Sequence, residues 1–247
     1  MAITVDRFSS EDLMARPQDY FRRKYVWEWP VRITHWVNAG SILVLFFTGL
    51  FIANPIFSPS GGGEAYQNLL MGRVRQVHFA FAFIFLVSFL VRIYWFWVGN
   101  VYARSGFPRV WVRRWWRDLF RQAGQYLRLE RGDVHLGHNA VAGLSYTIGV
   151  IGMGWAQILT GLALYSQSNP GGFLDGLVGW VIPLLGGSFQ VHMWHHLFAW
   201  LFITFAILHV YIVFYNGQRY RNGLLSSMFS GVKFYREGDL DHDTRLS

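Results

Sequence analysis

The stretch VHMWHHLFAWLFITFAILHVYIVFY, residues 191–215, decides the fold of this chain. It places His195 and His209 in an apolar run that is long enough to cross a bilayer as a helix. A helix turns about 100° per residue, so the two histidines lie within roughly 40° on one face, about 21 Å apart. Ionisable rings inside a membrane helix are costly unless something holds them. A metal cofactor near each side of the membrane is the simplest holder, which suggests a protein that carries electrons across the membrane.

Three other segments have a similar length and apolar character, so the chain holds four. They cover residues 34–53, 77–98, 141–165 and 191–215. Each has about the 20 residues that a membrane-spanning helix needs. Turn-rich connectors follow the first and the third, at 54–72 and 166–190. We therefore predict an all-α fold, an integral membrane bundle of four transmembrane helices. This membrane domain would cover residues 25–235, between tails at 1–24 and 236–247.

The basic residues set the expected orientation of the bundle. Nineteen of the 22 Lys and Arg residues fall in residues 1–34, in the 99–140 connector or after residue 215, and the turn-rich connectors have none. The positive-inside rule makes the basic side cytoplasmic and places both termini there. This predicts a multi-pass protein of the cytoplasmic (inner) membrane of a bacterium or archaeon. The net charge of +8 then reflects topology, and we expect membrane lipid rather than nucleic acid as its partner.

Arg and Trp alternate in residues 108–120 of the middle connector. This pattern suits a helix that lies along the inner membrane interface. An ordinary juxtamembrane anchor that binds anionic headgroups is the favoured reading of the same pattern.

The expected orientation assigns a depth to four membrane histidines. His78 and His195 fall near the outer face, and His35 and His209 near the inner face. Imidazole binds haem iron, and facing helices build cofactor sites of this kind. The pairs His78/His195 and His35/His209 therefore predict two bis-histidine haems. The chain has no cysteine, so neither haem is covalently attached. A hydrogen-bonded interior histidine is the alternative for each residue alone, but four at matched depths favour haem.

Two histidines that neighbour His195 are less suited to bind haem iron. His196 points away from the common face and His192 also departs from it, although His192 could compete with His195. Thr48-Gly49 and Thr160-Gly161 each come late in an outward-running segment. Their glycines suit close helix packing and the approach of a flat macrocycle equally well.

Several motifs together resemble the b-type cytochrome subunit of membrane-bound nickel–iron hydrogenases. These motifs are residues 25–36 with Thr48-Gly49, 71–79, 92–95 with 98–100, Gly137-His138-Asn139, 192–197 with 209–211, and 226–231. The resemblance covers about residues 25–235. It implies a four-helix membrane cytochrome with two haem b groups. It also implies partners: the small and large subunits of an outward-facing hydrogenase, with an iron–sulfur cluster of the small subunit as electron donor and quinone as acceptor.

The resemblance also implies a tentative quinone site at His138 and Asn139. In the related formate dehydrogenase and thiosulfate reductase subunits, an asparagine before the third helix lies near quinone. Ala140 departs from the proline expected after this His-Asn pair, a local difference.

We thus expect an electron-transfer subunit with no hydrogen chemistry of its own, because no set of cysteines is available to hold nickel. One alternative is the equivalent cytochrome b subunit of a formate dehydrogenase or thiosulfate reductase. A second is a histidine-based metal transporter. The apolar segments contain no Asp or Glu, which argues against a proton relay of the kind such a transporter uses.

Overall fold

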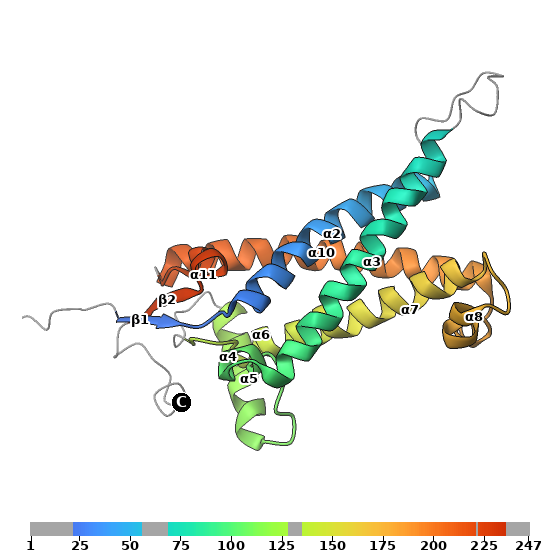
Figure 1. Ribbon diagram of the computed structural model, residues 1–247. Helices are drawn as coiled ribbons and strands as arrows, with labels where there is room; N and C mark the ends of the chain where they lie inside the picture. Colours follow the sequence, from blue (N-terminus) through green and yellow to red (C-terminus); the bar gives the residue numbers. More distant parts are fainter. Residues whose placement is uncertain (1–21, 56–68, 128–134, 221, 236–247) are drawn as a thin grey trace, which may run out of the picture.

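The computed structural model describes residues 22–55, 69–127, 135–220 and 222–235. Four long helical stretches run through it (Figure 1): α2 (Trp29–Ala53), α3 (Leu69–Val98), the continuous stretch of α6 (Ala140–Ser145), η2 (Tyr146–Gly152) and α7 (Met153–Ser166), and α10 (Ser188–Tyr220). Each stretch is long and apolar enough to cross a membrane. This confirms the predicted all-α bundle of four transmembrane helices. The predicted tails lie outside the described residues, apart from 22–24.

The long helices extend beyond their predicted bounds, which followed the apolar residues alone. α2 begins at Trp29 rather than near residue 34, with Pro30 in its first turn. That position suits proline, because the first turn of a helix has no use for its missing N–H. α3 begins at Leu69, so Arg73 lies within the helix. Polar and basic side chains continue a helix where it leaves the hydrocarbon layer, since headgroups and water solvate them.

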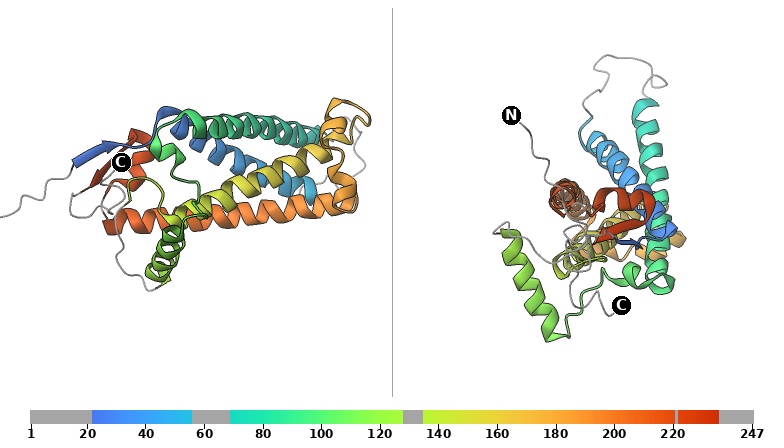
Figure 2. Two further views of the ribbon diagram at one scale, coloured as in Figure 1. Left: turned by 90° about the horizontal axis from the view of Figure 1, so that it is seen from below. Right: turned by 90° about the vertical axis from the view of Figure 1, so that its left-hand side faces the viewer.

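The long helices pack as two pairs that cross each other. α2 packs along α3, and α7 packs along α10 (Figures 1 and 2). The contact between pairs includes Phe85 and Phe89 of α3, Ile158 of α7 and Phe202 of α10, which are all buried. A Cβ at Gly154 would lie 2.5 Å from the Phe89 ring, so glycine allows α7 to approach α3. The outer sides of the helices expose large apolar side chains, as a lipid-facing surface requires.

The two ends of the described chain meet in a small sheet that the sequence did not predict. β1 (Arg22–Tyr25) pairs antiparallel with β2 (Val232–Tyr235), with Arg22 opposite Tyr235. Next to it lie α4 (Val101–Arg104), α11 (Leu224–Ser230) and a core of buried residues. This core contains Val26, Trp27, Val31, Tyr102, Ala103 and Leu136. We call this end of the bundle the inner end, and the opposite end the outer end, after the expected topology.

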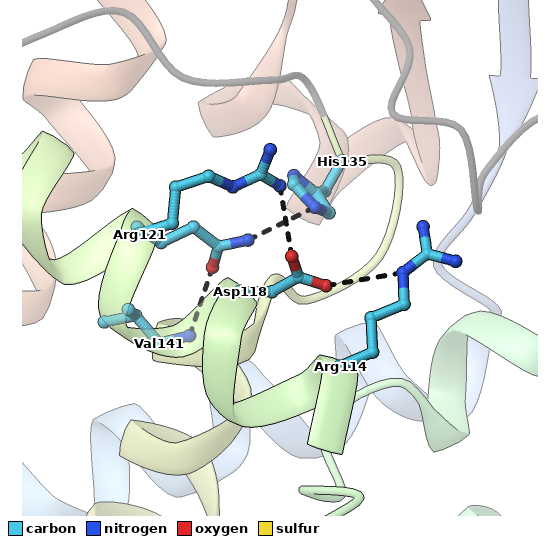
Figure 3. A network of polar contacts seen from close by, with 6 residues as sticks. Arg114, Asp118, Arg121, His135 and Val141 are labelled. Carbon is cyan, nitrogen blue, oxygen red and sulfur yellow. Dashed lines mark hydrogen bonds and ion pairs between the residues drawn. The ribbon is translucent and has the colours of Figure 1, made fainter. Parts of the chain in front are cut away.

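A basic helix, α5 (Arg113–Leu127), projects from the inner end (Figure 2). Its Asp118 lies 3.9 Å from Arg114 and 3.4 Å from Arg121 (Figure 3). Gln122 accepts a hydrogen bond from the Val141 backbone N–H at 3.4 Å, which ties α5 to the start of the third transmembrane stretch. α5 also exposes Phe120 at 69%. The second half of the Arg- and Trp-rich segment is therefore helical, and the aromatic and basic side chains of this helix suit a membrane surface.

The connector at the outer end is more ordered than its turn-rich sequence suggests. Two short helices, α8 (Phe173–Val178) and α9 (Val181–Leu184), fold against the end of α7. Val178 and Val181 are buried there with Ala163. Most of the other predicted connector, 54–72, lies outside the described residues.

Candidate functional site

His35 of α2 and His209 of α10 face each other near the inner end. Their ring centroids are 6.3 Å apart, and the ring planes are inclined by 53°. A metal–imidazole bond is about 2 Å long, so two imidazoles on opposite sides of one iron have centroids about 6 Å apart. The structure thus brings these two predicted residues to a spacing that suits a shared iron atom.

Aromatic rings hold this inner pair on both sides. The Phe205 ring stacks on His209 at 5.9 Å, and the Trp36 ring meets His35 edge-on at 5.0 Å. Phe205 in turn packs against the π-helical segment η2, where a Cβ at Gly149 would lie 2.7 Å from the ring. A π-helical turn re-aims the residues around it and is common at functional sites. Here the turn and its glycine let the third transmembrane stretch approach the ring that supports His209.

The outer histidines are each held by a threonine of the neighbouring helix. Nδ1 of His78 lies 2.8 Å from Oγ1 of Thr48, and Nδ1 of His195 lies 2.9 Å from Oγ1 of Thr160. The His78 and His195 rings make no direct ring contact in the described part of the chain. The structure therefore fixes each outer ring separately and does not pair the two by contact.

The threonine contacts determine which nitrogen of each outer ring is free. Thr48 donates its hydroxyl proton to the Val44 carbonyl at 2.7 Å, and Thr160 donates to the Ala156 carbonyl at 2.6 Å. A hydroxyl has one proton, so toward the histidine each threonine acts as acceptor. The Nδ1 atoms must then carry the protons, and each Nε2 keeps its lone pair. This is the tautomer that a metal-binding histidine needs, with its second nitrogen held by a hydrogen bond.

Each threonine is followed by a glycine that contacts the same histidine. A Cβ at Gly49 would lie 3.4 Å from Cε1 of His78, and one at Gly161 would lie 3.1 Å from Cε1 of His195. The two Thr-Gly dipeptides thus build the same local arrangement on α2 and α7. Close approach to the histidine ring explains the glycines. The dipeptides were visible in the sequence, but nothing in them signalled the hydrogen bonds to histidine.

Several buried polar atoms without a hydrogen-bond partner occur at the levels of these histidines. At the inner level they are Nδ1 of His35, Oδ1 of Asn38, Nε of Arg32 and Nη1 of Arg92. At the outer level, Oε1 of Gln157 has no partner, while its Nε2 lies 3.3 Å from Nε2 of His195. Buried polar groups in a folded protein are normally satisfied. Polar atoms left without a partner beside these histidines fit a bound polar prosthetic group, which at His195 would have to displace the Gln157 amide from Nε2.

The remaining sequence-predicted site residues, His138 and Asn139, lie immediately before the third transmembrane stretch. His138 lies between the rings of Trp27 and Tyr146, at 5.2 and 5.5 Å, and its Nδ1 is 3.0 Å from Oγ of Ser105. Burial, together with the nearby positive charges of Lys233 and Arg92, lowers the pKa of His138 to about 3. His138 is therefore neutral at pH 7.

Asn139 is the N-cap of α6, a common role for asparagine at that position. Its Oδ1 accepts from the Ala142 backbone N–H at 2.8 Å, and its Nδ2 donates to the Tyr126 hydroxyl at 3.1 Å. Both ends of the amide are thus engaged within the protein. His192 also has a local partner, because its Nδ1 donates to the Ser188 carbonyl at 2.8 Å.

Sequence reasoning missed two groups of residues at these levels. The first is the threonine pair described above. The second is a set of buried cations at the inner end, Arg32, Arg92 and Lys233. The available signal was a basic side chain within or beside an apolar segment, such as Arg92 within residues 77–98.

Comparison with known proteins identifies the family. Residues 26–231 match the family model for prokaryotic cytochrome b561. A probable nickel–iron hydrogenase B-type cytochrome subunit of Azotobacter chroococcum is 41% identical over 217 residues, covering 86% of this chain and 89% of the relative. The relative of the same name in Cupriavidus necator is 39% identical and covers 86% of this chain and 88% of its own length.

A further relative extends the match over almost the whole chain. The probable nickel–iron hydrogenase 1 B-type cytochrome subunit of Escherichia coli K12 is 34% identical over 240 residues, covering 94% of this chain and all of the relative. The family match and the four helices able to span a membrane agree with each other. This chain belongs to the prokaryotic cytochrome b561 family and is an integral membrane protein that transfers electrons through haem b.

Proposed function

We propose that this chain is a di-haem subunit that passes electrons from a nickel–iron hydrogenase to the quinone pool. The observation that carries the proposal is that the rings of His35 and His209 face each other, with their centroids 6.3 Å apart. At the outer end, His78 and His195 are held in the tautomer that binds a metal. His35 and His209 would hold the inner haem, and His78 and His195 the outer haem. Haem b supplies reversible one-electron transfer between ferric and ferrous iron. The protein holds the imidazoles, orients them and excludes water around them.

The names of the relatives support a hydrogenase as the electron donor. Each of the three relatives above is named as a nickel–iron hydrogenase subunit, which favours this partner over a formate dehydrogenase or thiosulfate reductase. We infer that the small subunit docks at the outer end and donates electrons from one of its iron–sulfur clusters. The large subunit would carry the hydrogen chemistry. The chain would sit in the cytoplasmic membrane of a bacterium, with its basic inner end in the cytoplasm.

We place the quinone near the inner pair, with His138 and Asn139 as its tentative site. Ser105 donates to the Tyr102 carbonyl at 2.7 Å, so it accepts from Nδ1–H of His138. Nε2 of His138 is then an acceptor that suits the hydroxyl of a quinol. A quinone carbonyl could take the Nδ2–H of Asn139 only by displacing Tyr126. In Asn139→Asp the cap survives, but the donor is lost. Slower oxidation of the inner haem by quinone would support the site, and unchanged kinetics would contradict it.

Haem stoichiometry tests the central proposal. A pyridine haemochrome assay on the full chain should return close to two haems b, all extractable by acid–acetone. His209→Ala or His35→Ala should remove one haem, and His78→Ala or His195→Ala the other. His196→Ala is the matched control on the same helix and should retain both. A fully loaded protein with one haem, or loss of haem from the control alone, would contradict the assigned pairs.

A further inference from the structure

Three cations are buried at the inner end without a carboxylate partner among the described residues. Arg32, Arg92 and Lys233 are only 5%, 7% and 3% exposed. The described residues contain three acidic side chains: Glu28, Asp118 and Asp175. In the described part of the chain, none of these acids forms an ion pair with the three cations; Asp118, for example, pairs with Arg114 and Arg121.

Glu28, the acid nearest in the chain to Arg32, is already engaged. One oxygen of its carboxylate accepts from Nε1 of Trp95 at 2.9 Å and from the Asn100 backbone N–H at 2.8 Å. Burying a charge without a counter-charge is costly. Three such charges at one end of the molecule, unpaired by any acid of the described residues, make this end suited to binding an anion.

The arginines retain donors that nothing in the described chain uses. Arg92 donates from Nη2 to the Ala103 carbonyl at 3.1 Å, and its guanidinium lies 5.3 Å from the centre of the Tyr146 ring. Its Nη1 has no partner. Arg32 donates to the Phe229 carbonyl and stacks on Trp29 at 4.1 Å, while its Nε has no partner. Both guanidinium groups are thus held in place, and each keeps an N–H group that donates no hydrogen bond within the described chain.

The cluster lies on the inner side of the His35/His209 pair. Arg32 precedes His35 by one turn of α2. Oγ of Ser88 contacts the carbonyl of Thr34 at 3.4 Å, which joins α3 to α2 beside His35, and Arg92 follows Ser88 by one turn. Lys233 approaches from β2.

Lys233 joins the cluster through the rings around His138. Its Nζ lies 5.1 Å from the centre of the Trp27 ring, which contacts His138, and it donates to the Leu136 carbonyl at 2.7 Å. Burial lowers the pKa of Lys233 to about 8, so its charge would gain from a nearby anion.

We propose that this cluster, with Arg92 as the direct contact, binds the propionate carboxylates of the haem held by His35 and His209. The inference rests on the proposed function, because it needs the inner haem. Guanidinium groups bind carboxylates through paired hydrogen bonds. The phosphate of an anionic lipid headgroup offers similar chemistry, and the experiment separates the two sources.

The test compares Arg92→Gln with Arg109→Gln in the full-length holoprotein. Arg109 is exposed at the same end of the molecule, so the control removes the same charge without touching the cluster. Arg92→Gln should lower the midpoint potential of the inner haem, because a nearby positive charge favours ferrous iron. The resonance Raman propionate bending band should shift as well. Arg92→Lys should keep most of the potential, and Arg109→Gln should leave both signals unchanged.

Reconstitution of the wild-type full chain gives a second measurement that does not depend on a variant folding. Haem dimethyl ester, which lacks the carboxylates, should bind the inner site at least about tenfold more weakly than haem. Equal affinity of the inner site for haem and its dimethyl ester would overturn the proposal. The proposal would also be overturned if Arg92→Gln gave the same Raman band and midpoint potential as the Arg109→Gln control. Loss of co-purified anionic phospholipid from Arg92→Gln, with the haem signals unchanged, would assign the cluster to lipid. Failure of the proposed function looks different, because the wild type would then lack the inner haem altogether.

Discussion

Two threonine hydroxyls determine the state of the outer histidines. Thr48 and Thr160 each donate their one hydroxyl proton to a carbonyl of their own helix, so each accepts a hydrogen bond from Nδ1–H of a histidine. Such a bond increases the electron density on the other ring nitrogen, as the second partner of a metal-bound histidine does. It also fixes the orientation of the ring.

Thr160→Val tests this role. Valine has nearly the same shape but cannot accept the bond, so His195 would donate less electron density to ferric iron. We expect the midpoint potential of the outer haem to rise while haem content stays at the wild-type level. A redox titration measures the change. Thr160→Ser keeps the hydroxyl and should leave the potential near the wild-type value; an equal shift in both variants would point to packing instead.

His138 should make the stability of the protein sensitive to mild acid. Burial, followed by the charges of Lys233 and Arg92, lowers its pKa from 6.5 to about 3. The unfolded chain therefore binds a proton below pH 6.5 that the folded protein does not bind. Stability is retained above pH 6.5 and is lost as the pH falls toward 3, by about 2 kcal/mol at pH 5.

His138→Gln removes this proton linkage. Thermal unfolding in detergent, followed by circular dichroism at pH 7 and pH 5, should show a smaller loss of stability in the variant than in the wild type. Equal losses in the two proteins would mean that His138 is protonated in the folded state.

At the scale of elements, α2 and α7 each contact a histidine of the neighbouring helix in the same way. Each has a threonine that binds a histidine and a following glycine that lets the ring come close. The sequence revealed the repeated dipeptide, because Thr-Gly comes late in two of the outward-running apolar segments. It did not reveal the hydrogen bonds, since these depend on how α2 meets α3 and how α7 meets α10.

Gly161→Val and Gly40→Val form a matched pair that tests this contact. A Cβ at Gly161 would lie 3.1 Å from the His195 ring, whereas a Cβ at Gly40 would have nothing within 4 Å. Both substitutions place valine inside a transmembrane helix, at a similar cost in propensity. We expect Gly161→Val to displace His195 and lower the content of the outer haem, with Gly40→Val unchanged. Haem quantification measures the effect. A normal haem content in Gly161→Val would contradict the prediction, because it would show that the His195 ring can move away from the added side chain.

Helix bounds and the terminal sheet mark the limit of what the sequence predicts locally. Hydrophobic length predicted four spans, since crossing a bilayer requires it. It missed the helix ends, because α10 continues to Tyr220 through residues that headgroups and water solvate. It also missed the pairing of β1 with β2, which joins segments from opposite ends of the chain. The buried cations escaped notice for the same reason: burial of Arg92 and Lys233 depends on contacts between distant segments.

For the whole molecule, the arrangement of the basic segments predicts its orientation. β1, α5 and α11 all lie at one end of the bundle with the charged residues, and α8 and α9 lie at the other (Figure 1). Reporter fusions after Tyr220 and in the α4–α5 connector should report the cytoplasm. A fusion in the α8–α9 connector should report the outside. The reverse pattern would exchange the inner and outer positions of the two histidine pairs.

Both proposed histidine pairs draw one member from α10, the last long helix to be made. His35 emerges from the ribosome 174 residues before His209. At typical rates of synthesis this interval lasts about 10 to 35 s. Neither iron position is complete until α10 has entered the membrane, and β2 closes the inner end later still. Loading of cofactor at either pair must therefore follow the insertion of α10, and a nascent chain halted before α10 would remain colourless.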